Sequence, residues 1–288
     1  MAVRVALGQT DCVLGDVEAN TRSAIRLAEQ AIRAGAQLIL FPEMSLTGYF
    51  LGDGIFDLAL RLDDPRLRPL LDASHDISMV IGMPLEEPGP RFYNAASYLE
   101  AGEFKHIHRK IYLPTFGAFD DARFFAQGDR MAAFDTRFGR MAMLICEDLW
   151  HPALAYLAAQ DGADYLLGVI ASPTSGVDKG FDPRLGYQAL HRAYASTLTC
   201  FVLACNRVGQ EGGLRFWGGS EVVGPDGTCL AQAEGSQEQL VLADLEPETL
   251  RRQRIKLPLL REERPELVLR ELQRIVGQRH PPELSRSL

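Results

Sequence analysis

The sequence predicts an α/β fold in which two packed β-sheets are flanked by helices. Short apolar runs typical of buried strands alternate with segments whose apolar residues recur at helical spacing. Hydrophobic residues make up 47% of the 288 residues, enough for one large buried core. No repeat, low-complexity block or internal linker interrupts this alternation, so we predict a single domain over residues 1–288.

The first part of the chain alternates strands and helices. Residues 3–9 alternate apolar and polar positions, which indicates a strand, and residues 16–34 place Ile25, Ala28 and Ile32 on one helical face. The pattern next predicts a buried strand at residues 36–41, a short helix near residues 65–73 and a strand at residues 79–82. A hairpin over residues 93–108 is expected to turn at Ala101-Gly102.

The second part continues the same alternation. The predicted elements are a strand at 141–146, a helix from Pro152 to Ala159, a strand at 165–170, a helix near 185–198 and a strand at 201–204. A turn signal at Pro225-Asp226-Gly227 predicts a hairpin within residues 218–233, and we expect residues 240–244 to extend that sheet. Residues 246–288 are charged and are predicted to form a C-terminal helical extension that ends in a polar tail.

Composition excludes several classes of partner. A net charge of −8 argues against binding to nucleic acid, which requires a clustered basic surface. The longest apolar stretches are far shorter than the ~20 residues of a membrane span, and residues 1–9 do not resemble a secretory signal. Five scattered cysteines do not suggest a disulfide framework, so we expect a cytoplasmic protein without membrane or nucleic-acid partners. These cysteines are Cys12, Cys146, Cys200, Cys205 and Cys229.

Three reactive residues follow apolar strands, where an α/β fold displays its functional groups. Glu43 follows residues 38–42, Lys110 ends the strand predicted from residue 105, and Cys146 directly follows residues 141–145. A helix N-terminus after Cys146 would favour a thiolate. Taken singly, each residue also has an ordinary interpretation, respectively as a helix cap, a surface lysine and a small core residue.

Together these segments resemble the nitrilase, or carbon-nitrogen hydrolase, superfamily, whose triad is a Glu, a Lys and a Cys in that chain order. The resemblance covers nearly the whole chain and implies a four-layer α-β-β-α sandwich, a single carbon-nitrogen hydrolase domain and a triad of Glu43, Lys110 and Cys146. The segments that carry it are Ala6-Leu7-Gly8-Gln9, Phe41 to Tyr49, Lys110 to Pro114, Cys146-Glu147-Asp148 and Gly219 to Gly227.

Within the superfamily, three segments are most similar to the glutaminase domain of glutamine-dependent NAD synthetases. They are residues 43–49, 113–120 and 145–150. No SGGxDS-like pyrophosphatase loop occurs in the sequence, so we expect these residues not to make NAD alone. The resemblance therefore implies a small-molecule amide substrate, a homo-oligomer of two or more copies and a separate synthetase as a candidate acceptor of ammonia.

The resemblance also implies residues around the substrate. Glu147 is the candidate partner for a substrate ammonium group, and Phe116 occupies the position where the related glutaminases usually carry a Tyr. Asp121 occupies the position of the superfamily's auxiliary Glu, and Ile170 replaces an Asn. Because Phe116 and Asp121 differ from the residues usual in the related glutaminases and in the superfamily, the sequence does not identify the acyl group of the substrate. The implied substrate-binding residues are Tyr49, Phe116, Glu147 and Ser172, each of which also has a structural interpretation as a packed or turn residue.

Amide hydrolysis by this triad needs no metal and no cofactor. Glu43 would accept the Cys146 proton as sulfur attacks, while the Lys110 ammonium and the Glu147 backbone N–H bind the oxyanion. Glu43 would then protonate the leaving ammonia and activate the water that hydrolyses the thioester, with Asp121 assisting. His106 and His108 point to one face of a strand, as metal ligands could, but no third ligand at matching spacing accompanies them.

Three alternatives to an amidase or glutaminase stay open. True nitrilases typically follow their Cys with Trp-Glu, whereas Glu147-Asp148 follows Cys146 here, which favours amides. An N-carbamoyl amidohydrolase would use the same triad. A non-catalytic assembly subunit would keep the fold without the chemistry, and the complete triad argues against it.

Overall fold

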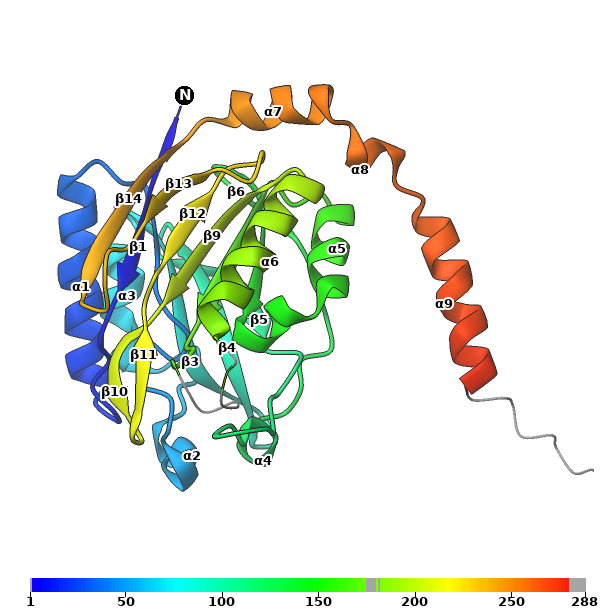
Figure 1. Ribbon diagram of the computed structural model, residues 1–288. Coiled ribbons are helices and arrows are strands. Elements are labelled where there is room, and N and C mark those ends of the chain that lie inside the picture. The colour runs from blue at the N-terminus through cyan, green and yellow to red at the C-terminus, as the bar shows by residue number, and fades with distance from the viewer. Residues whose placement is uncertain (1, 175–179, 181, 280–288) are drawn as a thin grey trace, which may run out of the picture.

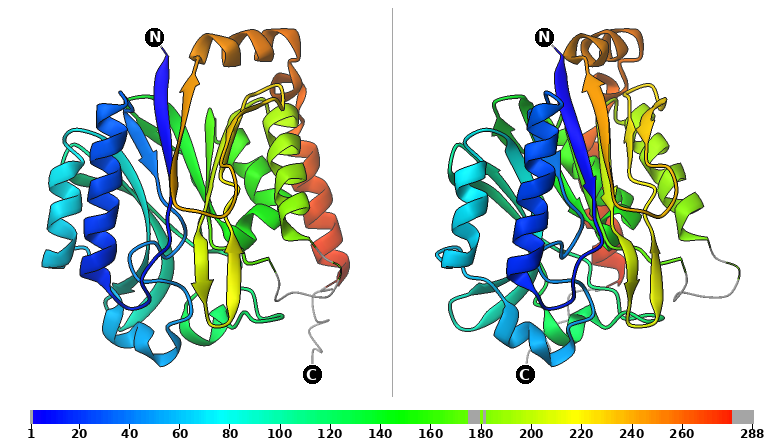
Figure 2. Two further views of the ribbon diagram at one scale, coloured as in Figure 1. Left: turned by 60° about the vertical axis from the view of Figure 1, so that its left-hand side comes forward. Right: turned by 90° about the vertical axis from the view of Figure 1, so that its left-hand side faces the viewer.

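Two six-stranded β-sheets lie face to face, and helices cover the outer face of each sheet (Figures 1 and 2). The structure is a computed structural model that describes residues 2–174, 180 and 182–279. The layers run helix, sheet, sheet, helix. This arrangement confirms the predicted four-layer α-β-β-α sandwich.

The first sheet has the strand order β14-β1-β2-β3-β4-β5. Strands β1, β2 and β3 are parallel, and α1 (Val17–Arg33) forms the crossover between the first two. Asp16 caps α1 by accepting a hydrogen bond from Ala19 N at 2.9 Å, as a side-chain oxygen at a helix start can. The strand bounds are β1 Val3–Gln9, β2 Leu38–Leu40, β3 Ser78–Glu87, β4 Arg91–Glu100, β5 Glu103–Arg109 and β14 Gln239–Leu245.

The second sheet has the order β13-β12-β9-β8-β7-β6 and carries α5 (Pro152–Gln160) and α6 (Pro183–Thr197) on its outer face (Figure 1). Its central strands β7, β8 and β9 are parallel and almost wholly buried, which explains their continuous apolar sequences. The strand bounds are β6 Phe134–Thr136, β7 Gly139–Ile145, β8 Tyr165–Ile170, β9 Phe201–Asn206, β12 Glu221–Val223 and β13 Cys229–Gln232.

The alternation of side chains along β2 shows how one strand serves two cores. Leu38 and Leu40 belong to the cluster between the two sheets, whereas Ile39 and Phe41 belong to the cluster beneath α1 and α3 (Arg68–Ala73). Leu167 and Leu203 of the second sheet belong to the same cluster as Leu38 and Leu40. The buried interior between the sheets therefore holds the strand ends in fixed positions.

The expectation that residues 240–244 extend the sheet of the 218–233 hairpin is wrong. These residues form β14, which pairs antiparallel with β1 over its whole length, from Val3 opposite Leu245 to Gln9 opposite Gln239. The edge of β1 would otherwise leave its backbone groups unpaired. The local turn signal set the hairpin of β12 and β13, but it could not specify which distant edge the next strand would join.

Some elements were not predicted. A two-stranded hairpin of β10 (Val208–Glu211) and β11 (Leu214–Trp217) turns at Gly212-Gly213, where both glycines have positive φ. Short helical segments also form at η1 Gly52–Gly54, α2 Ile55–Leu58 and α4 Asp121–Phe124, whereas η2 Pro65–Leu67 begins the helix predicted near residues 65–73. The hairpin of β10 and β11 becomes important at the site.

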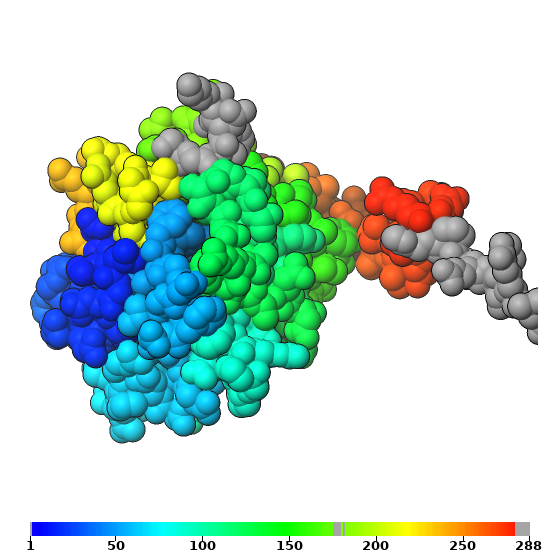
Figure 3. All heavy atoms as spheres, turned by 90° about the horizontal axis from the view of Figure 1, so that it is seen from below, coloured from blue at the N-terminus to red at the C-terminus, as the bar shows by residue number. Residues whose placement is uncertain are grey.

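The C-terminal extension leaves the sandwich in steps. Helix α7 (Pro247–Lys256) crosses one end of the sheets, where Arg254 pairs with Asp164 at 2.7 Å, and α8 (Leu259–Glu262) leads into α9 (Pro265–Arg279). Helix α9 projects from the body and buries none of its residues (Figures 1 and 3). The predicted polar tail lies outside the described residues. Within the described ranges, no helix is long and apolar enough to cross a bilayer.

Candidate active site

Three strand ends meet in the interior and bring the predicted triad together. Glu43 lies three residues beyond β2, Lys110 directly follows β5, and Cys146 directly follows β7. The residues are 0%, 0% and 6% exposed, respectively. The two sheets thus contribute one site at their carboxyl ends, although 67 residues separate Glu43 from Lys110 along the chain.

Cys146 has an uncommon backbone conformation. Its φ is +46°, in the left-handed region that non-glycine residues rarely occupy, and it opens the short 3-10 turn η3 (Cys146–Trp150). Met44, next to Glu43, has φ +52°. The chain turns sharply at both reactive positions, and at Cys146 the turn carries the thiol away from β7 into a cavity.

Asp148 holds the turn after Cys146 against the segment after Lys110. Its Oδ2 accepts a hydrogen bond from Ile145 N at 3.1 Å, and its Oδ1 accepts from Ile111 N and Tyr112 N at 3.1 and 2.9 Å. The same carboxylate hydrogen-bonds with His108 Nε2 at 2.9 Å. Because both residues are buried, this pair fixes the relative positions of two strand ends.

His108 and His106 of the same strand make separate contacts. His108 pairs with Asp148, whereas the ring of His106 stacks on Phe134 at a centroid distance of 4.2 Å. Burial lowers the pKa of His106 to about 4. The geometry gives both rings a structural role.

The Glu43 carboxylate accepts three hydrogen bonds. Oε1 accepts from Lys110 Nζ and from Asn94 Nδ2, each at 2.7 Å, and Oε2 accepts from Ala171 N at 2.9 Å. Asn94 lies in β4, Lys110 directly follows β5 of the same sheet, and Ala171 directly follows β8 of the second sheet. The carboxylate therefore has one fixed orientation.

Lys110 lies between two carboxylates. Its Nζ also donates to Asp121 Oδ2 at 2.7 Å, and the Tyr49 hydroxyl donates to Asp121 Oδ1 at 2.5 Å. Asp121, the residue at the position of the auxiliary Glu, is thus in direct contact with the ammonium rather than with Cys146. Tyr49 supports this contact from behind the carboxylate.

Burial dominates the electrostatics of the site. Burial and Asp121 raise the pKa of Glu43, while Lys110 lowers it. Burial disfavours the Lys110 ammonium, but Asp121 and Glu43 outweigh burial and hold the pKa of Lys110 well above its usual value. Burial and the nearby Glu43 raise the pKa of Cys146 well above that of a free thiol. Burial thus opposes the thiolate that a helix N-terminus would favour, and a base that accepts the thiol proton assists the attack.

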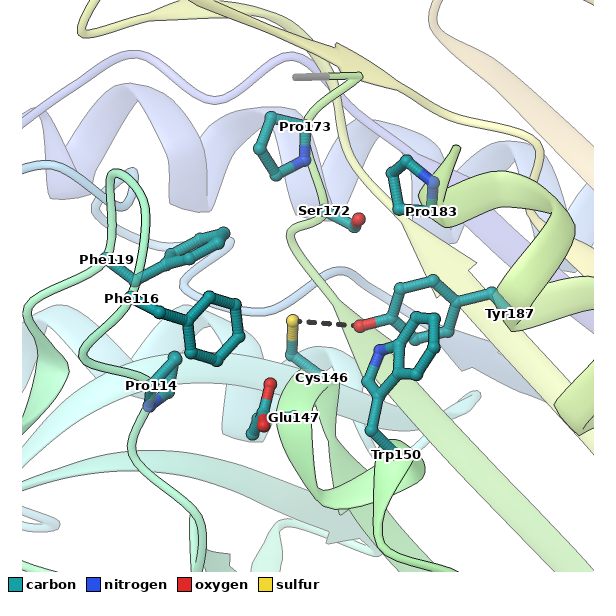
Figure 4. Close-up of a pocket in the computed structure, with 10 residues that line it drawn as sticks. All are labelled: Pro114, Phe116, Phe119, Cys146, Glu147, Trp150, Ser172, Pro173, Pro183 and Tyr187. Atoms are coloured by element: carbon teal, nitrogen blue, oxygen red, sulfur yellow. Dashed lines mark hydrogen bonds between the residues drawn. The ribbon is translucent and has the colours of Figure 1, made fainter. Parts of the chain in front are cut away.

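The thiol opens into a cavity of about 170 Å³ (Figure 4). Of the four residues expected around the substrate, Phe116, Glu147 and Ser172 line it, while Tyr49 is not among the described lining residues and points its hydroxyl at Asp121. The lining residues are Pro114, Phe116, Phe119, Cys146, Glu147, Trp150, Ser172, Pro173, Pro183 and Tyr187.

Proline and aromatic side chains form most of the cavity wall. Glu147 is the one charged residue among the described lining residues, and no Lys or Arg accompanies it there. Its carboxylate lies 3.5 Å from His151 Nε2, and burial raises the pKa of Glu147. The wall suits a small, largely apolar ligand, and the single carboxylate can receive a cationic group.

A buried ion pair supports the chain that follows Glu43. Glu211, at the end of β10, accepts a hydrogen bond from Tyr49 N at 2.7 Å and another from Phe50 N. Its other oxygen accepts from Arg207 Nη1 at 2.5 Å, and the Arg207 side chain is fully buried. The unpredicted hairpin of β10 and β11 therefore positions Tyr49, and through it Asp121.

Sequence reasoning missed several residues of the site. Asp148 lies within the segment that resembles the family, and its place two residues after Cys146 was the one local signal for it. Asn94 and Tyr187 lie inside a predicted strand and helix, where nothing in the sequence distinguishes them from packing residues. The Tyr187 hydroxyl lies 3.2 Å from Cys146 Sγ.

The fold and the site together define the class: an α-β-β-α sandwich with a buried Glu, Lys and Cys at its strand ends. Residues 4–255 match the family model described as carbon-nitrogen hydrolase, and the chain belongs to that family. It is therefore a member of an enzyme class that hydrolyses carbon–nitrogen bonds other than peptide bonds. This membership confirms the resemblance seen in the sequence motifs.

Known proteins similar to this chain cover several activities. A glutamine-dependent NAD(+) synthetase from Thermotoga maritima is 30% identical over 251 residues, which are 85% of this chain and 42% of the relative. An N-carbamoylputrescine amidase from Arabidopsis thaliana is 26% identical over 267 residues, covering 88% of this chain and 89% of the relative. The crystal structure of a carbon-nitrogen hydrolase from Helicobacter pylori G27 superposes with a TM-score of 0.87 at 23% identity, covering 94% and 99% of the two chains. The chain thus spans less than half the length of the synthetase relative.

Proposed function

We propose that this protein hydrolyses a small carboxamide, glutamine-like or other, to a carboxylic acid and ammonia through a thioester on Cys146. The observation that carries the proposal is the contact of the Lys110 ammonium with Glu43 in a buried site beside the Cys146 thiol. That arrangement offers a nucleophile, a base and an oxyanion donor together.

In the first half-reaction, Glu43 takes the Cys146 proton as sulfur attacks the amide carbon. Because burial raises the pKa of both groups, the carboxylate is a better base than an exposed one. The Lys110 ammonium and the Glu147 N–H bind the oxyanion that forms. The carbon–nitrogen bond then breaks, and Glu43 returns its proton to the leaving ammonia.

In the second half-reaction, Glu43 activates a water molecule that hydrolyses the thioester and restores the thiol. Asp121 assists by holding the Lys110 ammonium in place, since its Oδ2 lies 2.7 Å from Nζ and its Oδ1 accepts from Tyr49. We therefore assign Asp121 and Tyr49 to positioning, and Phe116, Glu147 and Ser172 to the wall around the acyl group.

The wall favours amides that carry an ammonium group or no charge. Glu147 can pair with a substrate ammonium, and a substrate carboxylate finds no cation among the described lining residues. An N-carbamoyl amine is the second candidate substrate, because its amine would face Glu147 and the Arabidopsis relative is named for a substrate of that kind.

Ammonia release decides between these substrates. We would assay glutamine, asparagine, carbamoyl amines, carbamoyl amino acids, simple aliphatic amides and nitriles with the wild type and with Cys146→Ala. We expect release from an amide or a carbamoyl amine by the wild type only. Release from nitriles alone would make the protein a nitrilase, and equal rates in both proteins would end the thiol mechanism.

We further propose that residues 1–288 form one cytoplasmic carbon-nitrogen hydrolase domain that assembles into at least a dimer through its 246–288 extension. Five free cysteines suit a reducing compartment, and an apolar stripe on α9 is exposed. The stripe comprises Val268, Leu269, Leu272 and Val276. Sedimentation of the wild type and of Leu269→Glu/Leu272→Glu tests this assembly, and a wild-type monomer at micromolar concentration would contradict the proposed dimer. A separate synthetase that accepts the ammonia is a candidate partner, as similarity to the Thermotoga maritima synthetase suggests.

A further inference from the structure

We propose that Tyr187 is a further catalytic residue, whose hydroxyl donates a hydrogen bond to the Cys146 sulfur and stabilises the thiolate as it forms. The inference rests on the proposed function for its biological meaning, but the contact itself can be tested without a substrate. Neither the motifs in the sequence nor the family resemblance assigned a role to this residue.

The geometry places the hydroxyl on the nucleophile. Tyr187 lies in the second turn of α6, and its Oη is 3.2 Å from Cys146 Sγ (Figure 4). Both residues line the cavity, and Tyr187 is 2% exposed. Bulk water therefore does not compete for this hydrogen bond.

The Tyr187 hydroxyl keeps its proton and directs it to sulfur. Burial raises the pKa of this hydroxyl well above its usual value, so it stays a donor at neutral pH. Among the described residues, this hydroxyl forms a hydrogen bond with the Cys146 sulfur, so the hydroxyl proton is directed to Sγ.

A glycine allows the Trp150 ring to pack against Tyr187. The Trp150 ring meets the Tyr187 ring edge-on at a centroid distance of 5.0 Å and an interplanar angle of 75°. A Cβ atom at Gly186 would lie 2.2 Å from the Trp150 ring, so a side chain at that position would push the indole away. The sequence of α6 thus permits the packing that orients Tyr187.

The Cys146 sulfur needs a hydrogen-bond donor of its own, because the Lys110 ammonium already donates to Glu43 and Asp121. Lys110 is bound to Glu43 and Asp121, and a negative Glu43 disfavours a nearby thiolate. Hydrogen bonding to the charged form of a group favours that form. Tyr187 is placed to supply this stabilisation at the moment when the proton moves to Glu43.

The test is the pH dependence of Cys146 alkylation by iodoacetamide, in which a sulfur–carbon bond forms and iodide leaves. Peptide mapping after timed quenching isolates labelling at Cys146 from that at the other cysteines. In Tyr187→Phe, we expect the alkylation profile to move to higher pH by about one unit and the rate at neutral pH to fall about tenfold, the effect of losing one charge-assisted hydrogen bond. Thermal melting of each variant checks the fold.

Tyr194→Phe is the matched control. Tyr194 lies on the same helix, is also buried, and donates to the Leu149 carbonyl oxygen at 2.7 Å rather than to sulfur. We expect its alkylation profile to match the wild type. A wild-type profile in Tyr187→Phe, or equal shifts in both variants, would overturn the proposal.

A second variant keeps the test decisive if Tyr187→Phe does not fold. Trp150→Phe keeps a ring but alters the edge-on packing that orients Tyr187, so we expect a shift in the same direction that is smaller than the shift caused by losing the hydroxyl itself. An unchanged profile in Trp150→Phe would then count against the proposal. Failure of the wild type to release ammonia would refute the proposed function alone, because alkylation needs no amide.

Discussion

Replacing Lys110 by Met should affect both catalysis and stability, because the ammonium serves two buried carboxylates as well as the oxyanion. Loss of one oxyanion donor typically lowers the chemical step by ~100-fold or more, and here a full charge is lost. The change also leaves Glu43 and Asp121 without their shared cation at 0% and 3% exposure. Breaking a buried pair in this way costs about 3–5 kcal/mol of unfolding free energy.

The stability effect has a definite pH dependence. Burial and Asp121 raise the pKa of Glu43, whereas Lys110 lowers it. Without Lys110, the folded variant should therefore bind a proton on the Glu43 and Asp121 carboxyl groups more tightly than the unfolded chain does. When the pKa of a group is higher in the folded state than in the unfolded state, its protonation stabilises the fold at low pH. This contribution to the free energy of unfolding is lost as the pH rises from the unfolded-state pKa through the folded-state pKa. The loss of unfolding free energy in Lys110→Met, compared with the wild type at the same pH, should therefore be larger at about pH 8 than at about pH 5.

Urea unfolding of both proteins at the two pH values, read beside steady-state ammonia release, measures these effects. Lys105→Met is the control, because Lys105 lies on β5, the strand that Lys110 follows, but is exposed and pairs only with Glu103 among the described residues. We expect the control to keep its activity and to change little in stability. A Lys110→Met protein with near-normal turnover and a pH-independent loss of stability would refute the reasoning.

Further predictions test the other members of the network. Cys146→Ala should release no ammonia and keep its circular dichroism spectrum and unfolding midpoint close to those of the wild type, since a small apolar residue replaces a buried thiol; unchanged turnover would end the mechanism. Glu43→Gln should slow both half-reactions and let an acyl-enzyme persist as a mass increase on Cys146 in intact-protein mass spectrometry, because the amide cannot carry a proton; fast turnover without an adduct would contradict the general-base role. Glu211→Gln should destabilise the fold by about 3 kcal/mol in urea unfolding, at the low end for a broken buried pair because Asp11 stays 3.6 Å from Arg207; a stability equal to that of the wild type would show that the pair does not hold the hairpin.

The positions of most elements could be predicted because the signals are local. The strands at residues 3–9 and 165–170 were predicted with the bounds that the structure gives, since apolar periodicity depends on neighbouring residues alone. The helix predicted at 16–34 also begins and ends where Asp16 caps it and Ala34 follows it. The length of a strand also depends on its pairing. Strand β3 runs from Ser78 to Glu87, beyond the predicted residues 79–82, because pairing with β4 extends it.

Local motifs were enough to identify the residues of the triad, since each of the three follows an apolar strand in a segment that resembles the family. The surroundings of these three residues depend instead on contacts between segments that lie far apart in the sequence. The pairing of β14 with β1, the contact of Tyr187 with Cys146 across 41 residues and the bond from Ala171 to Glu43 across 128 residues all join distant segments. The protonation state of Cys146 depends likewise on burial, which strips water from the thiol only after both sheets have packed. Local sequence specifies the backbone of each element, but desolvation and long-range contacts exist only in the assembled fold.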